Sequence, residues 1–420
     1  MPDCALMSNP LQVASLPMRI ALWNTAFLGD AVLTLPLIRV VKECFPGAEL
    51  DFYVRQGLAG LFEGHPDIAH VYAMDRKTRS VANLPALGKL LSGRGYALWV
   101  CAHPSFRSAV ICRLSGAAMR VGYSEQPLAR LFFTHSVSRR FSELDEIERL
   151  LQLTIPLESA TPQATMRAKA AHSPLQSEEE QHWPYLVLPA EARAEAALFY
   201  DGLRDGAASL SLRATTVTDH AKPATPPVLG VHPGSVWPTK RWPVEYFAEL
   251  CTKALRGGAH VLVFAGPGEE GVAQRMLDCI DTAGNDCSAR VYNLSGKLGL
   301  AGLAAHIGGL SCYVTNDSGP MHLAWAQRVP VTALFGPTTR QLGFFPRGRG
   351  ATVMELPLDC RPCGLHGHRE CPKGHHNCMR ALTPDMVWAD VANKLWPDGN
   401  LPEPAPQICS KGTMSCLPNT

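Results

Sequence analysis

Residues 310–339 have the sequence LSCYVTNDSGPMHLAWAQRVPVTALFGPTT, and their pattern decides the predicted fold. Apolar runs at 310–314 and 329–335 predict two buried strands, and residues 321–327 between them predict a helix. Small polar turns, NDSGP and GPTT, follow the two strands. In an open parallel sheet, ligands bind beyond the carboxyl ends of the strands, and free backbone N–H groups at a helix start attract phosphate. The stretch therefore predicts a strand–helix–strand unit that carries a phosphate-type site.

Strands and helices alternate in the same way through the rest of the chain. Predicted strands lie at 19–23, 49–54, 71–74, 96–102 and 120–123 in the first half, and at 228–231, 260–265 and 291–294 in the second. This alternation implies βαβ units and parallel sheets. The predicted fold class is therefore α/β, with two doubly wound domains that face a central cleft, where a ligand is expected to bind.

The predicted domain boundaries follow changes in composition. Residues 1–155 are assigned to an N-terminal domain and residues 185–395 to a C-terminal domain. The polar, aperiodic residues 156–184 between them are predicted to be a linker zone. Residues 205–226 are predicted to be a low-order insertion, and the Pro-rich residues 396–420 a disordered tail.

Composition limits the classes of partner. Lys and Arg number 39 against 37 Asp and Glu, so no strong positive field attracts nucleic acid, and none is expected as a partner. Residues 1–18 lack the basic start and apolar core of a signal peptide. No apolar run approaches the roughly 18 residues that span a bilayer. These features predict a cytoplasmic protein.

Glycine-bearing loops follow several predicted strands of the second half. They lie at 233–235, 266–268, 317–319 and 336–338. Each alone is weak evidence because turns require Gly and Pro, but together they favour a nucleotide or phosphate site. The chain has neither the GxxxxGK[ST] motif of P-loop ATPases nor a GxGxxG motif after its first strand. A P-loop ATPase and a dinucleotide-dependent dehydrogenase are therefore disfavoured.

Three charged residues are candidates for the chemistry. Lys240 and Arg241 lie between two Trp-Pro pairs, where they could neutralise a diphosphate or form an ordinary solvated pair. Asp30 follows Gly29 at a predicted helix start, where it could cap the helix, act as a general base, or do both. Because D-x-D pairs for a divalent metal are missing, Lys240, Arg241 and helix N-termini would have to stabilise a departing diphosphate. No cofactor is expected for catalysis.

The cysteines fall into two groups. Of the 14 cysteines, most are scattered singly in apolar surroundings, which is typical of buried small hydrophobic residues. Four others, with histidines among them, cluster in the loop 360–378: Cys360, Cys363, Cys371 and Cys378. The first pair has a spacing that suits zinc or an iron–sulfur cluster, whereas the later gaps are irregular. A structural metal, a cross-linked loop and free thiols all remain open, and a catalytic metal is not expected.

Several of these motifs together resemble glycosyltransferase family nine, the inverting ADP-heptose:lipopolysaccharide heptosyltransferases. The resemblance covers roughly residues 18–395 and is carried by DSGPMHLA at 317–324, FGPT at 335–338, HPGS…KRWP at 232–243, and IxxWNxxxLGD with a following xxxTxP through Asp30 and Pro36. The four clustered cysteines also resemble a cysteine-bearing loop of some members. The turn NTAFLGD and the insertion at 205–226 depart from the family pattern.

The resemblance implies a GT-B architecture, with two Rossmann-like domains that bind the acceptor on the N-terminal side and the nucleotide sugar on the C-terminal side. In that family pattern Asp30 matches the general base, and Lys240 matches the lysine at the donor phosphates. The loop of Asp317, Ser318 and Gly319 matches the diphosphate and sugar site, and Glu269 or Glu270 lies near the expected ribose. The donor-binding set is completed by residues inside the matched motifs: Ser235, Arg241 and His322.

The expected reaction is transfer of heptose from ADP-L-glycero-D-manno-heptose to the inner core of lipopolysaccharide, with inversion. The alternatives are a nucleotide-sugar epimerase of the same architecture and a non-catalytic protein that binds sugar nucleotides. The implied lipid A–core acceptor is amphiphilic, so peripheral contact at the inner membrane face is expected. Candidates for that contact, with a buried hairpin as the alternative, are Phe132, Phe133, Arg139 and Arg140.

Overall fold

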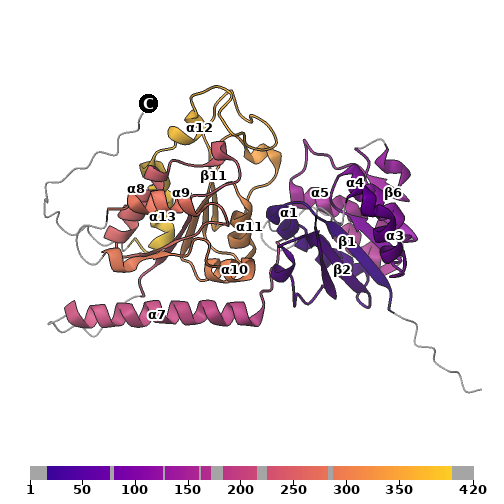
Figure 1. The fold of residues 1–420 in the computed structure, drawn as a ribbon, viewed down its shortest axis with the longest axis horizontal. Helices are drawn as coiled ribbons and strands as arrows, with labels where there is room; N and C mark the ends of the chain where they lie inside the picture. The colour runs from indigo at the N-terminus through magenta and orange to yellow at the C-terminus, as the bar shows by residue number, and fades with distance from the viewer. Residues whose placement is uncertain are drawn as a thin grey trace, which may run out of the picture.

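The computed structural model describes residues 17–75, 80–125, 128–159, 162–171, 183–214, 225–281 and 287–399. The chain folds into two lobes that meet along one boundary, with the N-terminal half in one lobe and the C-terminal half in the other (Figure 1). The long helix α7 (Ala190–Ala214) runs beneath the C-terminal lobe.

The N-terminal domain has a parallel sheet with the strand order β3-β2-β1-β4-β5-β6 in the described part of the chain. Its strands are β1 (Arg19–Asn24), β2 (Glu49–Arg55), β3 (His70–Met74), β4 (Leu98–Cys101), β5 (Met119–Tyr123) and β6 (His135–Val137). Its helices are α1 (Leu28–Leu33), α2 (Leu35–Cys44), α3 (Leu84–Ser92), α4 (Phe106–Leu114), α5 (Glu146–Leu151) and α6 (Pro162–Ala171). The order reverses between β1 and β4, which is the switch point of a doubly wound sheet.

The C-terminal domain repeats this plan with the order β12-β11-β10-β7-β8-β9, again parallel where the structure describes it. Its strands are β7 (Val228–His232), β8 (His260–Val263), β9 (Val291–Asn293), β10 (Cys312–Asn316), β11 (Val331–Leu334) and β12 (Ala351–Met354). Besides α7, its helices are α8 (Val244–Arg256), α9 (Glu270–Asp278), α10 (Leu300–Gly308), α11 (Gly319–Ala326), α12 (Asn377–Arg380) and α13 (Pro384–Leu395). The prediction of two Rossmann-like α/β domains is confirmed.

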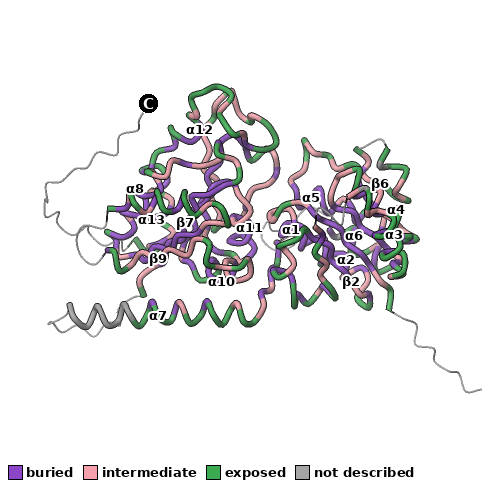
Figure 2. Tube along the Cα trace, in the orientation of Figure 1, coloured by how far each residue is buried: buried purple, intermediate pink, exposed green. Residues whose placement is uncertain are grey.

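The central strands are buried on both faces because helices cover both sides of each sheet. All five residues of β10 are buried, as are those of β7. Figure 2 shows the buried strands inside each lobe and the exposed residues on the outer faces of the helices. Continuous apolar runs, rather than alternating ones, are what such strands require, so the opening stretch was predictable from its pattern alone.

The helical segment that begins beside Asp30 consists of two helices, α1 and α2, that meet at Thr34. Pro36 has no backbone N–H and fits the first turn of α2 better than the interior of one long helix. The Thr34 hydroxyl donates to the Asp30 carbonyl oxygen at 2.7 Å, which satisfies the end of α1. As a result α1 is a separate short helix that presents Asp30 at the domain boundary. The short strands β6 and β12 were missed because their residues are only partly buried.

The segments expected to lack structure are partly helical. Within 156–184 the helix α6 packs on α2 and buries Ala164 and Ala168 completely. An apolar face made of alanines gives little periodic signal, which explains the error. Residues 205–214 of the predicted insertion continue α7, while 215–224 lie outside the described residues. Most of the predicted tail, 396–420, also lies outside them, and the proposed domain boundaries stay a prediction.

Helices α1 and α11, one from each domain, pack against each other at the boundary. A Cβ atom on Gly29 would lie 2.7 Å from His322 Cδ2, and one on Gly319 would lie 3.0 Å from Leu28 Cβ. These approaches are closer than ordinary side-chain contacts, so the two helices meet through glycines. The carboxyl ends of β1 and β10 thereby come within reach of one another.

The last helix, α13, is fixed to the sheet by a polar cluster. Asp390 accepts hydrogen bonds from Thr332 (2.6 Å), Thr352 (2.8 Å) and Lys394 (2.5 Å). Because the Lys394 side chain is only 11% exposed, removing Asp390 leaves a cation with one partner fewer in a largely dry site.

We expect Asp390→Ala to lower the free energy of unfolding by about 2–3 kcal/mol, measured by urea denaturation. The matched control is Asp281→Ala, which removes a carboxylate paired with Arg256 where both side chains are nearly half exposed. That change should cost less than about 1 kcal/mol. Equal losses in the two variants would show that Asp390 does not anchor α13.

Candidate functional site

A cavity of about 190 Å³ lies at the boundary between the domains, beyond the carboxyl ends of both sheets. Most of the residues predicted for the site line it: Asp30 from the N-terminal domain, and Ser235, Lys240, Asp317, Ser318, Gly319 and His322 from the C-terminal domain. Its remaining walls include aromatic rings, among them Phe27, Trp237 and Phe344. The structure therefore brings together residues that are almost 300 positions apart in sequence.

Asp30 lies on the first turn of α1, three residues after Phe27, rather than at the N-cap position expected from the sequence. Its carboxylate accepts a hydrogen bond from the Phe27 backbone N–H at 3.1 Å. Burial raises the pKa of Asp30, while the Phe27 N–H and the charge of Arg139 lower it. Asp30 thus stabilises the helix start and also lines the cavity, while its role as a general base stays a prediction.

Lys240 forms an ion pair with Asp317 across the cavity wall, with 2.5 Å between Nζ and Oδ2. Each side chain is 11% exposed. Thr338 Oγ1 donates to the same carboxylate oxygen at 2.6 Å. The ammonium group is therefore held at a fixed point, where an incoming anion would meet it.

A buried amide that the sequence analysis overlooked holds the loops of this site. Asn316 Nδ2 donates to the carbonyl oxygens of Pro233 (3.0 Å) and Gly234 (3.1 Å), and its Oδ1 accepts from the Trp242 N–H (2.9 Å). Asn316 is the last residue of β10 and is fully buried. The available signal was an Asn directly after an apolar run, which the sequence analysis took as turn chemistry.

His322 contributes a neutral imidazole to the cavity. Burial is the main cause that lowers its pKa to about 4, so the ring is uncharged at neutral pH. Its Nδ1 is buried and has no hydrogen-bond partner among the described residues. The ring packs against Gly29 of the other domain. The uncharged imidazole therefore forms part of the cavity wall where the two domains meet.

Arg241 and Glu269 do not line this cavity, although both lie in the adjoining loops. Arg241 Nε donates to the Ser235 carbonyl oxygen at 2.8 Å. Glu269 Oε2 accepts from the Gly266 N–H at 3.2 Å and lies 3.5 Å from His232 Nε2, whose pKa burial lowers. Glu269 thus lies where β7 and β8 end, beside the loop whose Ser235 lines the cavity.

The cysteine-rich loop, residues 360–378, packs over the segment that carries Lys240. The His366 ring stacks on Trp237 with 6.2 Å between centroids, and His366 lines the cavity. Thr239 Oγ1 donates to the His368 carbonyl oxygen, and His376 Nε2 bonds the Thr239 carbonyl oxygen at 2.7 Å. This loop therefore shapes the site, which its cysteine spacing did not indicate.

For the four cysteines of this loop the sequence left three states open: a structural metal, a cross-link or free thiols. Within the described ranges, no group of three or more His, Cys, Asp or Glu side chains is arranged to hold a metal ion. Cys360, Cys363, Cys371 and Cys378 are free thiols, and the Cys363 thiol donates to the Cys360 carbonyl oxygen. The structural metal stays a prediction, to be tested by metal analysis of the purified protein.

Two further cavities lie at the carboxyl end of the N-terminal sheet, and His103 lines both. One, of about 270 Å³, is lined by Tyr123, Phe133, Arg139 and Phe141 among others. The second, of about 530 Å³, includes Arg55, Gln56 and Asp75. The second is also lined by residues 25–27, which lead to Asp30, and the first shares His103 with it, so space for a second ligand exists in the domain that carries Asp30.

Of the four residues suggested for membrane contact, three are partly buried against the protein and one is exposed. Phe133 packs on Gly122, and Arg139 forms two hydrogen bonds to Glu146. Phe132 contacts the ring of Phe106, while Arg140 is exposed. Larger exposed apolar side chains in this region are Leu128, Leu131 and Phe106. Phe133 and Arg139 are thus partly buried, but the segment is not the hairpin named as the alternative, because β6 pairs with β5 in parallel.

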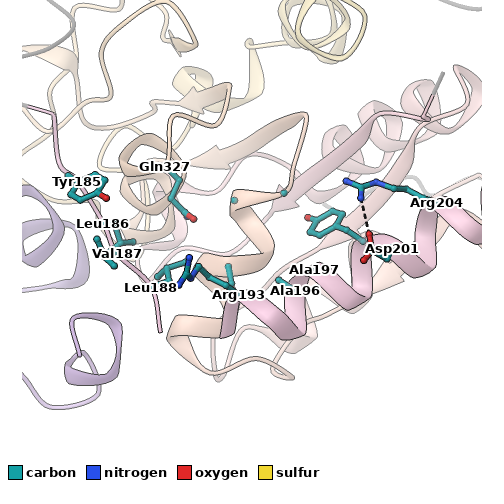
Figure 3. A pocket seen from close by; sticks show the side chains of 14 residues that line it. Tyr185, Leu186, Val187, Leu188, Arg193, Ala196, Ala197, Asp201, Arg204 and Gln327 are labelled. Carbon is teal, nitrogen blue, oxygen red and sulfur yellow. Dashed lines mark hydrogen bonds and ion pairs between the residues drawn. The ribbon is translucent and has the colours of Figure 1, made fainter. Parts of the chain in front are cut away.

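A cavity of about 460 Å³ lies elsewhere, between α7 and the body of the C-terminal domain (Figure 3). Its charged residues are at the surface, where Arg204 pairs with Asp201 and both side chains are about 60% exposed. None of the residues predicted for the site lines it. The chemistry is therefore assigned to the boundary cavity. In the described part of the chain, no helix is both long and apolar enough to cross a membrane.

Comparisons with known proteins agree with this architecture. The chain is 31% identical over 169 residues to lipooligosaccharide heptosyltransferase 2 of Campylobacter jejuni, and spans 51% of that relative and 40% of itself. It is 25% identical over 389 residues to lipopolysaccharide heptosyltransferase 2 of Salmonella typhimurium, covering 91% of this chain and 100% of the relative. The solved structure of E. coli ADP-heptose lps heptosyltransferase II matches with a TM-score of 0.67 and 21% identity, over 91% of this chain and 99% of that one.

The likeness to that structure confirms the predicted GT-B fold. The family description "Glycosyltransferase family 9 (heptosyltransferase)" matches residues 84–373, which is more than half of the chain. The match includes the loops of Ser235, Lys240 and Asp317. The chain therefore belongs to glycosyltransferase family 9.

Proposed function

We propose that this enzyme is an inverting heptosyltransferase that transfers heptose from ADP-L-glycero-D-manno-heptose to the inner core of lipopolysaccharide. The observation that carries the proposal is that Asp30 of one domain and the Lys240–Asp317 pair of the other line one cavity. A base in one domain and a cation in the other suit a reaction in which the acceptor attacks one face of the sugar and the diphosphate departs from the opposite face. The relatives named above, which are lipopolysaccharide and lipooligosaccharide heptosyltransferases, support the choice of sugar and acceptor.

In this proposal Asp30 is the general base. It removes the proton from an acceptor hydroxyl as that oxygen attacks the anomeric carbon opposite the diphosphate, which inverts the configuration. The raised pKa of Asp30, caused mainly by burial, makes the carboxylate a stronger base than an exposed aspartate. The His322 imidazole, uncharged at neutral pH, adds no positive charge that would weaken this base.

The leaving ADP is stabilised from the C-terminal domain. Lys240 balances the charge that develops on the diphosphate, and the start of α11, at Ser318 and Gly319, lines the same cavity. When the donor binds, Lys240 either donates to both Asp317 and the diphosphate or gives up Asp317 for the diphosphate. The rest of the donor is assigned to the adjoining loops, where Ser235 and Arg241 lie near the phosphates and Glu269 near the ribose.

The acceptor is assigned to the two cavities of the N-terminal domain. They lie in the domain that carries Asp30. Their aromatic side chains suit a sugar ring, and their cationic side chains suit its anionic groups. A lipid A–core acceptor is anchored in the membrane, so the enzyme works in peripheral contact with the cytoplasmic face of the inner membrane. The exposed side chains of Leu128 and Leu131 support this contact because they offer apolar surface to a membrane.

We expect Asp30→Asn to lower kcat by on the order of 10²- to 10⁴-fold, because the amide cannot accept the proton. ADP binding, measured by calorimetry, should stay within about twofold of wild type because the donor groups lie in the other domain. The assay is ADP release from ADP-heptose with a lipid A–core acceptor. Undiminished transfer would remove Asp30 from the mechanism, and donor isomerisation without acceptor would indicate an epimerase instead.

We expect Lys240→Met to lower kcat/KM by on the order of 10²- to 10³-fold, because one charge at the leaving group is lost. Lys253→Met serves as the control, since Lys253 pairs with Glu249 and Asp385 on the outer face of α8. That variant should retain wild-type kinetics. If Lys240→Met transfers heptose normally, the cation does not act on the leaving group.

We expect the transfer rate to be unchanged after dialysis against EDTA and assay in metal-free buffer. Lys240 and the N–H groups of α11 are placed to balance the diphosphate charge, so the proposed mechanism needs no divalent ion. Restoration of activity by added Mg²⁺ or Mn²⁺ after a clear loss would contradict this proposal.

A further inference from the structure

A buried ionic cluster lies beside the boundary cavity, and two of its members, Glu146 and Arg149, have no role in the assignments above. Glu146, the first residue of α5, is 3% exposed. Its carboxylate oxygens accept hydrogen bonds from Arg139 Nη2 at 2.8 and 2.7 Å, and from Arg149 Nη1 at 3.2 Å. Arg149 is fully buried and contacts the ring of Phe141, 4.1 Å from its centroid. Two cations thus converge on one buried carboxylate.

The cluster is completed by the other domain. Arg149 Nη1 donates to the Leu342 carbonyl oxygen at 2.8 Å, and the Glu146 N–H donates to the Gly343 carbonyl oxygen at 3.0 Å. Arg347 pairs with Asp145, the N-cap of α5, at 2.6 Å. We call residues 342–347 the docking segment. Its Leu342 also lines the cavity that holds Asp30, so domain contact and active site share the same residues.

Gly343 allows the docking segment to approach this closely. Its φ of 84° lies in the left-handed region, where a side chain is strained. A Cβ atom there would lie 2.7 Å from Asp145 Cα and 2.8 Å from Arg149 Nη2. Any larger residue would therefore push the segment away from α5.

We propose that Glu146 is a positioning residue that holds Arg139 beside Asp30, and that contact with the docking segment completes this arrangement. The inference rests on the proposed role of Asp30 as the base. Glu146 fixes Arg139 through both carboxylate oxygens, while Arg149 ties Glu146 to the other domain. When the domains separate, Arg149 loses its Leu342 partner and the cluster becomes solvated. The environment of the base is therefore complete only while the domains are in contact.

The charge of Arg139 has a defined effect on the base. Burial raises the pKa of Asp30, and Arg139 opposes it because a nearby cation favours the carboxylate. The charged and titratable groups around Asp30 are Arg139, Glu146 and His366, with Lys240, Asp317 and His322 in the shared cavity. If Arg139 leaves its place, the pKa of Asp30 rises. Since the base must be deprotonated, the acid limb of the kcat/KM profile then moves to higher pH.

The direction in which the acid limb moves when Glu146 is replaced distinguishes loss of a positioned Arg139 from simple loss of the Glu146 charge. Removing the negative charge of Glu146 alone would favour the Asp30 carboxylate and move the acid limb to lower pH. Loss of a positioned Arg139 moves it to higher pH. Glu146→Ala should therefore shift the limb upward by on the order of half a pH unit, which is about a threefold loss of kcat/KM on the acid side. Glu143→Gln, at an exposed residue paired with Arg140, should keep the wild-type profile.

Two more variants test the same arrangement if Glu146→Ala does not fold. Arg139→Met removes the cation directly and should shift the limb upward. Gly343→Ala should shift it upward and also increase the radius of gyration measured by small-angle X-ray scattering, because the docking segment is displaced. Gly258→Ala is its control, since Gly258 has the same φ of 84° and nothing within 4 Å of the added Cβ. It should change neither quantity.

An acid limb that stays in place or moves to lower pH in Glu146→Ala, or in Arg139→Met where the former does not fold, would overturn the inference. Failure of the proposed function looks different, because then wild type itself makes no heptosylated product or Asp30→Asn leaves transfer intact. The scattering comparison does not depend on activity. An unchanged radius of gyration in Gly343→Ala would remove the docking segment from the proposal.

Discussion

The C-terminal half of the site depends on the side-chain amide of Asn316. The carboxamide hydrogen-bonds the end of β10 to the loop after β7 and to the backbone N–H of Trp242. A buried amide must satisfy its donors and acceptor, so these loops cannot move apart without leaving polar groups unpaired. Lys240 and Asp317, which flank these bonds in the chain, are brought to ion-pair distance as a result. The arrangement of the proposed donor site is thus set by one residue that does not line the cavity.

The sequence was sufficient for the plan of the molecule. Fully buried parallel strands require continuous apolar runs, and both domains contain them, so the doubly wound sheets could be predicted from pattern. Parallel strands also place all their carboxyl ends on one edge, which is why turn residues such as Ser235 and Asp317 could be assigned to one site. Asp30 was singled out as an acidic residue after the first strand–glycine turn, but its proposed role as a base came from the family resemblance and not from the pattern.

What could not be predicted depends on contacts distant in sequence. Helix α6 packs through alanines, whose small side chains leave almost no periodic hydrophobic pattern in the sequence even though they are buried. The role of the loop 360–378 depends on Thr239 and Trp237, more than a hundred residues away. Arg149 was not singled out because an arginine on a charged helix usually faces solvent, whereas here a segment from the other domain covers it. In each case the role of a residue depends on the distant residue that it contacts, and the local sequence pattern does not reveal that contact.

The Lys240–Asp317 pair has a consequence for which anions can occupy the cavity. Because the ammonium group already has a carboxylate and the carboxylate already has Thr338, the cavity presents no free positive charge of its own in this part of the structure. An anion gains Lys240 only by competing with a partner held in place by the fold. A ligand with one weak negative charge has little to offer in that exchange, whereas a diphosphate offers several oxygens at once. The pair thus favours ligands that bring several anionic oxygens to Lys240 over ligands that carry one weak negative charge.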